Sequence, residues 1–113
     1  MKIPKKLIVG GRLIDIELSK DLIDKKNLLG QCIYNENKII LQTPCDGFTE
    51  EKMYETLWHE LVHAMFNVAG HNELSNNEQI VDLLATFIRG IERQLHGTDS
   101  KEIKNRKNTR TKV

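Results

Sequence analysis

The chain has 113 residues, of which 39% are hydrophobic, and a formal net charge of +1. A chain this short buries roughly two thirds of its unfolded surface, which supports one modest core and excludes a separate substrate-binding domain. The near-neutral charge gives no electrostatic reason to expect nucleic acid or an anionic membrane as a partner. This value is an average, because residues 98–113 carry a net charge of +4 and residues 1–97 a net charge of −3.

The two cysteines, Cys32 and Cys45, are too few and too irregularly spaced for a disulfide framework or a CxxC metal site. This favours two reduced thiols in a cytoplasmic protein. The apolar run after the first lysines, Leu7 to Val9, is too short for a signal peptide, and no stretch approaches the ~20 apolar residues of a membrane span. We therefore expect a cytoplasmic protein with no membrane partner.

The first half of the chain is predicted to form two β-hairpins with a short helix between them. The strands are expected at residues 6–10, 12–18, 29–34 and 38–42. Gly10-Gly11 suits the turn of the first hairpin, and Asn35-Glu36-Asn37 tolerates positive φ in the second. Ser19 is expected to be the N-cap of the short helix, which ends at Asn27 or Gly30.

The second half is predicted to form two long helices. Thr49, followed by two glutamates, begins the first by capping, and it ends near Ala69, where Gly70 can take a left-handed conformation. The run Ser75-Asn76-Asn77-Glu78 matches a capping box and begins the second, which continues to Gly97. Its apolar positions are Ile80, Val81, Leu84, Ala85, Phe87, Ile88, Ile91 and Leu95.

These elements predict an α+β fold with a single domain over residues 1–97. Small antiparallel hairpins would pack on the two long helices. Residues 98–113 are basic and almost free of apolar side chains, so we expect a disordered tail. Such tails commonly serve solubility, and weak contact with nucleic acid through this tail is the alternative.

The first long helix contains His59-Glu60-Leu61-Val62-His63. A spacing of four returns the second imidazole to ~40° from the first, one turn along the axis, so both rings can reach one metal ion. Glu60 lies at the edge of the same face, where it can hold a metal-bound water as a general base. The surrounding residues are uncharged, which indicates a buried helix with no other reason to carry these groups. They are Leu57, Trp58, Leu61, Val62, Ala64 and Met65.

The second long helix offers a third ligand. Catalytic zinc takes three protein ligands and leaves the fourth position to water. Glu78 lies in the first turn of this helix, and Asp82 interrupts its apolar face four residues later. We expect Glu78 to bind the metal and Asp82 to accept the outer N–H of a ligating histidine, which fixes its tautomer.

H-E-x-x-H on one helix followed by E-x-x-x-D on the next resembles the gluzincin class of zinc metallopeptidases. The small size, the run from Glu78 to Ala85 and the alanine after His63 are most similar to the ImmA/IrrE-type metallopeptidases of phages and mobile elements. The resemblance covers about residues 30–95 and departs from that family at Val81 and Asp82, where Ala and Asn are usual. Its specific positions are His59, Glu60, His63, Glu78 and Asp82.

The resemblance implies a minimal zincin-like domain with one Zn²⁺ that hydrolyses peptide bonds in a cytoplasmic protein substrate. Zinc lowers the pKa of its bound water to near 7, and Glu60 takes the proton and later delivers it to the leaving amine. Tyr34 and His71 are the two candidates for stabilising the oxyanion. An extended peptide would pair with a strand at the sheet edge above the cleft. The candidate strand is Lys38, Ile39, Ile40, Leu41 and Gln42.

Two alternatives remain open. The first is a non-catalytic, zinc-containing module that docks a partner on its edge strand, although a structural site has no use for a general base at Glu60. The second is a core without metal, in which Glu78 and a buried Asp82 hydrogen-bond to His59 and His63.

Overall fold

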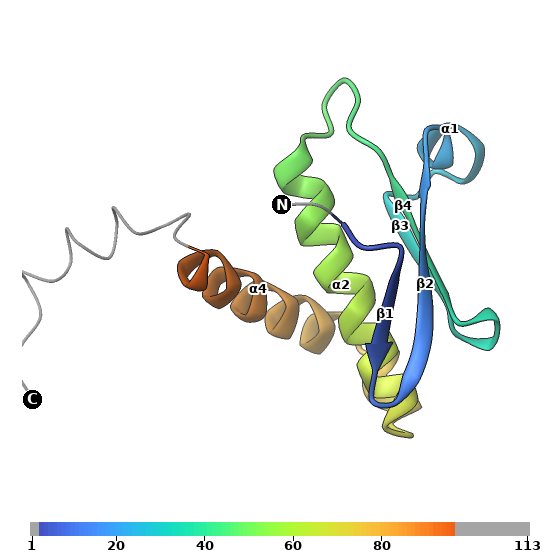
Figure 1. Cartoon of the computed structure of the whole chain (residues 1–113), viewed down its shortest axis with the longest axis vertical. Helices are drawn as coiled ribbons and strands as arrows, with labels where there is room; N and C mark the ends of the chain where they lie inside the picture. The colour runs from blue at the N-terminus through green and yellow to red at the C-terminus, as the bar shows by residue number, and fades with distance from the viewer. Residues whose placement is uncertain (1–2, 97–113) are drawn as a thin grey trace, which may run out of the picture.

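The computed structural model describes residues 3–96, which form a mixed four-stranded sheet with two long helices on one of its faces (Figure 1). The elements are β1 (Lys6–Val9), β2 (Arg12–Ser19), α1 (Leu22–Lys26), β3 (Gly30–Ile33), the 3₁₀ turn η1 (Tyr34–Glu36), β4 (Lys38–Gln42), α2 (Glu50–Val68), α3 (Asn72–Ser75) and α4 (Glu78–Leu95). The predicted α+β class is confirmed. No helix between residues 3 and 96 combines the length and apolar character needed to cross a membrane. The tail predicted to be disordered lies outside the described residues.

Both predicted hairpin turns are present. Val9 pairs with Arg12 in an antiparallel register, and φ is 56° at Gly10 and 85° at Gly11. Positive φ at both central residues is what a type I′ turn requires, and glycine adopts it without steric cost. In the second hairpin η1 carries the chain around, and Asn37 ends it with φ of 54°.

The sheet has the strand order β1-β2-β4-β3, so β4 is a central strand. It pairs in parallel with β2 on one side, with Ile16 opposite Ile39, and antiparallel with β3 on the other. The prediction that Lys38–Gln42 offers a free edge is therefore wrong, because neighbouring strands occupy the hydrogen-bonding groups on both sides of β4. The free edges belong to β1 and β3.

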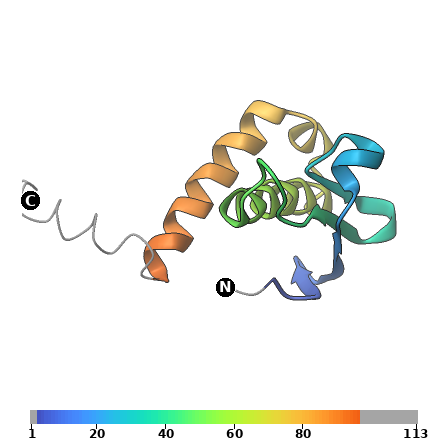
Figure 2. The same ribbon diagram turned by 90° about the horizontal axis from the view of Figure 1, so that it is seen from above.

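Helix α2 lies between the sheet and α4 (Figure 2). Two clusters of buried side chains join these layers, and burying each large apolar side chain contributes about 1.5–3 kcal/mol. The cluster between sheet and α2 contains Ile14, Ile16, Ile39, Leu41, Leu57 and Leu61. The cluster that includes α4 is smaller and contains Val62, Val81 and Ala85. The prediction that α2 is a buried core helix agrees with this position.

The helix caps agree with the sequence in part. Thr49 accepts a hydrogen bond from the Lys52 N–H at the start of α2, as predicted. Helix α4 instead begins after Asn77, whose side chain accepts from the Ile80 N–H at 3.2 Å. The predicted capping box at Ser75 is therefore wrong, because Ser75 ends α3 and its hydroxyl donates to a backbone carbonyl of α2.

The first helix shows a similar difference. Asp21, not Ser19, occupies the N-cap position of α1, and the Ser19 hydroxyl donates to the Asp21 carboxylate at 3.0 Å. Asn27 ends α1 with φ of 55°, at one of the two positions predicted.

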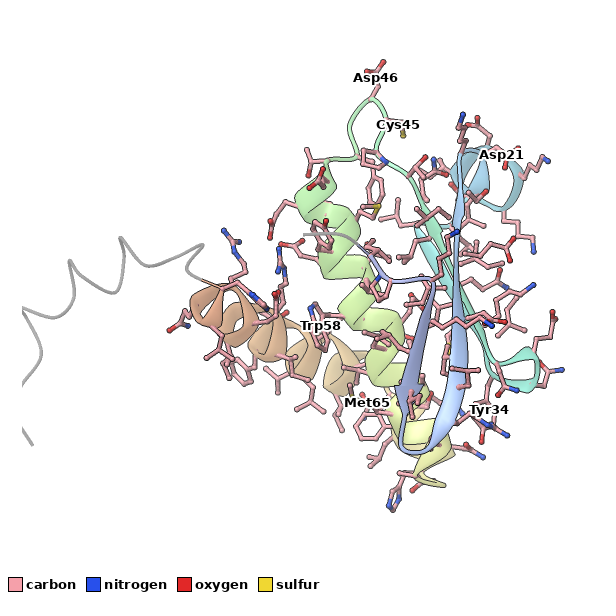
Figure 3. The ribbon with its side chains drawn as sticks, in the orientation of Figure 1. Asp21, Tyr34, Cys45, Asp46, Trp58 and Met65 are labelled. Atoms are coloured by element: carbon pink, nitrogen blue, oxygen red, sulfur yellow. The ribbon has the colours of Figure 1, made fainter. Side chains whose placement is uncertain are left out.

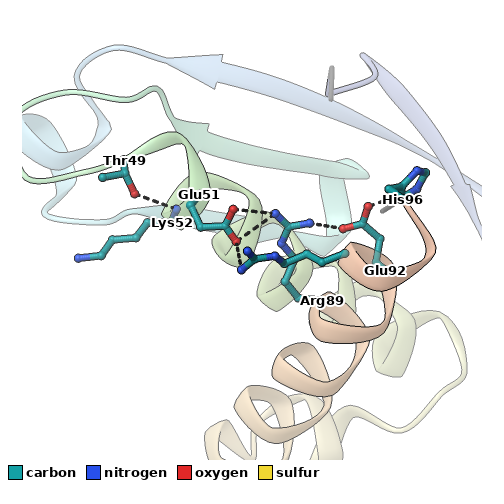
Figure 4. Close-up of polar contacts among 7 residues, drawn as sticks. Thr49, Glu51, Lys52, Arg89, Glu92 and His96 are labelled. Atoms are coloured by element: carbon teal, nitrogen blue, oxygen red, sulfur yellow. Dashed lines mark hydrogen bonds and ion pairs between the residues drawn. The ribbon is translucent and has the colours of Figure 1, made fainter. Parts of the chain in front are cut away.

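A charged network fixes the far half of α4 on the first turn of α2 (Figure 4). The buried guanidinium of Arg89 donates to both carboxylate oxygens of Glu51, at 3.1 and 3.0 Å, and also to Glu92. Arg93 donates to Glu51 at 3.0 Å. These bonds hold the far half of α4 on α2, and the packing of Val81 and Ala85 holds its other half.

Candidate metal centre

The imidazoles of His59 and His63 converge with the carboxylate of Glu78. The helical spacing of four places both Nε2 atoms on one side of α2, 3.3 Å apart. One oxygen of Glu78 lies 3.1 Å from the Nε2 of His59, and its other oxygen lies 3.1 Å from the Nε2 of His63. These residues form a possible metal-binding triad whose ligand atoms all lie within 4.8 Å of one another.

The separations between these atoms fit a zinc ion. Ligands that bind zinc at ~2.0–2.1 Å with tetrahedral angles lie about 3.3 Å from one another. The two Nε2 atoms lie 3.3 Å apart, and each lies 3.1 Å from a different oxygen of Glu78, so the cluster has the dimensions of a zinc site in which Glu78 presents one oxygen to each ring. Two imidazoles and one carboxylate are also a ligand set that zinc takes in catalytic sites.

The outer nitrogens of both histidines have hydrogen-bond partners. The Nδ1 of His59 lies 2.7 Å from a carboxylate oxygen of Asp82 and donates to it. The Nδ1 of His63 lies 3.2 Å from the hydroxyl oxygen of Ser75. That hydroxyl donates its own proton to the backbone carbonyl of His63 at 3.3 Å, so its oxygen accepts from Nδ1–H. These partners place a proton on Nδ1 of both rings, so that each neutral ring presents the lone pair of its Nε2 to the cluster.

This tautomer assignment brings three acceptors together. When both rings are neutral, two Nε2 lone pairs and a carboxylate lie within hydrogen-bond distance, and they repel one another unless a metal ion or a proton lies between them. The hypothesis of a metal-free core also expected a buried Asp82, but the side chains of Glu78 and Asp82 are 62% and 67% exposed. The cluster therefore has the chemistry of an open cation site more than that of a satisfied core network.

Glu60 lies beside the triad but is itself buried, with 8% of its surface exposed. Burial raises the pKa of its carboxyl to about 7, because the charged form loses water. The charge of His59 and a backbone hydrogen bond from Cys32 lower this pKa, and the charge of Glu78 raises it. A carboxyl with such a pKa can take up and release a proton near neutral pH.

The edge strand β3 runs beside Glu60. Gln42 donates its backbone N–H to the Leu29 carbonyl at 2.9 Å, so these two residues form a hydrogen-bonded pair. Hydrogen-bonded pairs alternate with non-hydrogen-bonded pairs along an antiparallel ladder, and the backbone groups of Gly30 and Cys32 therefore point away from β4. A Cβ on Gly30 would lie 2.6 Å from Cγ2 of Thr56 and 3.2 Å from Cγ of Glu60. Only glycine allows β3 to approach α2 this closely.

Two adjoining cavities of about 540 and 490 Å³ open along this edge, and both include Gly30, His59 and Glu60. The larger extends between β3 and α4 toward Arg89 and is lined partly by leucines. The smaller covers the triad. The structure thus provides a groove that passes over the candidate metal centre.

The structure does not bring Tyr34 or His71 to this groove. Tyr34 lies on the sheet side of the molecule, away from α4 (Figure 3), where the guanidinium of Arg12 stacks on its ring at 4.4 Å. His71 is the N-cap residue of α3, and its Nδ1 lies 3.4 Å from a carboxylate oxygen of Glu73. Neither Tyr34 nor His71 lines either of the two cavities found between residues 3 and 96.

Three polar residues near the triad were not predicted from the sequence as site residues. Ser75 orients His63, and the amides of Asn67 and Asn76 line the smaller cavity. Asn67 follows His63 by four residues, so the helical period could have placed it on the ligand face. Ser75 and Asn76 lie where α3 ends, and no local pattern indicates that this turn returns to α2.

No known protein family, curated protein or solved structure was found to match this chain.

Proposed function

We propose that this chain is a zinc-dependent peptidase of gluzincin type, with His59, His63 and Glu78 as zinc ligands and Glu60 as general base. The observation that carries this proposal is the convergence of three acceptor atoms beside a buried carboxyl whose pKa is about 7. A purely structural zinc site is closed by four protein ligands and needs no base. Here Glu78 is largely exposed, and the cluster opens into a groove.

The chemistry divides between a metal and the side chains around it. A zinc ion held by the triad would lower the pKa of a water molecule and polarise a peptide carbonyl. Glu60 would accept the proton of the attacking water at its carboxylate and return it to the leaving amine. Asp82 and Ser75 would keep the imidazoles oriented during this cycle. Asn67 and Asn76, which line the smaller cavity, would supply the amide donors for a developing oxyanion in place of Tyr34 and His71.

The substrate strand proposed here is β3, in place of β4. Its Gly30 backbone groups face the groove, and the Cys32 N–H already bonds to Glu60. An extended peptide that added to this edge would lie over the triad with its backbone hydrogen-bonded and its side chains alternating between the cavities. By the resemblance described above, a cytoplasmic protein is the proposed source of such a peptide.

Zinc analysis of purified protein tests the ligands. The wild type should hold one equivalent of zinc, and both His59→Ala and Glu78→Ala should lose it, because each removes one ligand of three. Glu55→Gln, an exposed change on the same helix, should keep it. Normal zinc content in Glu78→Ala would contradict the ligand assignment.

Cleavage of a peptide library tests the base. Glu60→Gln should keep its zinc but lose at least ~100-fold in cleavage rate, the usual contribution of a general base. Full activity in this variant would refute the role of Glu60. A wild type that binds zinc yet cleaves no peptide would favour the non-catalytic binding module.

A further inference from the structure

The outward side of α4 carries a row of large apolar side chains that nothing in the described residues covers. Figure 3 shows carbon-rich side chains along the lower side of α4 in that view. We call this row the α4 apolar face. It consists of Leu83, Leu84, Phe87, Ile91 and Leu95, whose exposed fractions run from 36% to 81%.

This face does not serve the metal centre. Ile91 follows Asp82 by nine residues, which at about 100° per residue places the two on opposite sides of the helix axis. The side toward α2 carries the small buried residues Val81 and Ala85, together with Arg89. The sequence therefore maintains two apolar sides on α4, although packing against α2 uses only one.

We propose that the α4 apolar face binds the same face of a second copy of this chain, with the two helices antiparallel. About a two-fold axis near position 89, Phe87 of each copy meets Ile91 of the other, and Leu83 meets Leu95. Gly90 and Gln94, which lie at the border of this face, carry no charge. Like charges therefore do not oppose the pairing, and the contact is self-complementary, as a two-fold interface must be.

The size of the face suits such a dimer. With roughly 200 Å² for each large side chain, the observed exposures amount to roughly 600 Å² per copy, or about 1,200 Å² for a pair. That total lies at the lower end of stable specific interfaces. The area per copy, roughly 600 Å², lies at the upper end of what the largest apolar patch of a typical monomer exposes.

Other occupants fit less well. Residues 97–113 contain six basic side chains but only Ile103 and Val113 as large apolar ones, too few to fill this face. An anionic membrane would favour lysines and arginines along the border of the apolar face. Helix α4 instead carries three acidic and two basic residues, and its net charge is negative.

Sedimentation equilibrium of the full chain tests the proposal. The measured mass of the wild type should be twice the chain mass of 13.1 kDa. Phe87→Glu/Ile91→Glu should raise the dimer dissociation constant at least ~100-fold, since both side chains lie at the centre of the interface. Leu13→Glu is the matched control, because it charges an equally exposed leucine on β2 and should leave the dimer intact. A monomeric wild type at about 100 µM would overturn the proposal, whether or not it bound anionic vesicles.

Cross-linking tests the antiparallel register and does not depend on the acidic variants folding. In a Cys45→Ser background, a mixture of Phe87→Cys and Ile91→Cys chains should form disulfide-linked dimers in greater yield than either chain alone. Equal yields from the mixture and the separate chains would refute the register. All of these variants should keep the zinc content of the wild type, because the α4 apolar face lies opposite the triad. A failure of the dimer proposal can therefore be distinguished from a failure of the proposed peptidase function.

Discussion

Glu60 makes the stability of the metal-free protein depend on pH in a direction that can be stated in advance. Its carboxyl is buried, and its pKa rises from 4.5 to about 7 on folding. The folded chain therefore binds more protons than the unfolded chain between these values. The contribution of Glu60 to the free energy of unfolding is fully present below the unfolded pKa and is lost as the pH rises through the folded pKa.

The magnitude follows from the shift. Each pKa unit corresponds to ~1.4 kcal/mol, so between about pH 5 and pH 8 the wild type should lose about 2 kcal/mol relative to a variant that cannot titrate at this position. Glu60→Gln is that variant, because glutamine keeps the size of the side chain and an oxygen that can accept the Cys32 N–H. It should be more stable than the wild type at about pH 8 and of similar stability at about pH 5.

Urea denaturation of chelator-treated protein at the two pH values measures this difference. Glu55→Gln on the exposed side of the same helix is the control and should follow the wild type at both. The residues of the triad are unchanged in all three proteins, so most of their contribution to the free energy of unfolding cancels in the comparison. If Glu60→Gln and Glu55→Gln change stability equally between the two pH values, Glu60 is not the buried carboxyl that the structure describes.

Four further substitutions, of which Gly90→Ala is a control, test the surroundings of the site. Ser75→Ala should weaken zinc binding about 10-fold in a competition titration, because His63 loses the acceptor that orients its ring, and unchanged affinity would exclude this role. Gly30→Ala should destabilise the fold by about 1–3 kcal/mol in thermal unfolding. Gly90→Ala, where an added Cβ meets nothing, should be neutral or stabilising. Arg89→Met should cost about 2 kcal/mol, since it removes the buried cation between Glu51 and Glu92 and leaves them only Arg93 and His96 as partners, and a stabilised variant would show that the network only offsets its own desolvation.

The positions of the triad could be predicted because each pair of groups is related by a helical period. His59 and His63 share a face of α2 by spacing alone, and Glu78 and Asp82 do so on α4. What the sequence could not give is the contact between the helices, which depends on the small residues Val81 and Ala85 against Val62. The expectation that Glu78 would join both histidines rested on its place in the first turn of an otherwise apolar helix and on the need of catalytic zinc for a third ligand, and the geometry agrees with it.

The arrangement of strands was less accessible. Both hairpins follow from local turn chemistry, with positive φ at Gly10, Gly11 and Asn37. The parallel pairing of β2 with β4 joins segments separated by α1 and β3, and no local pattern specifies it. This one pairing decides which strand is free, so the sequence identified the correct hairpin but the wrong member of it as the edge beside the groove.

Helix α4 shows why a long amphipathic pattern does not by itself identify a core. Apolar residues occupy more than half of its circumference, and the sequence offers no means of separating the side that meets α2 from the side that does not. In the structure the two sides differ in the size of their side chains. The buried side has Val81 and Ala85, and the exposed side has Phe87 and Ile91. Small residues let α4 approach α2 closely enough for Glu78 to reach two histidines. The large residues on the opposite side have no such function within the described part of one chain, and the proposed dimer would bury them.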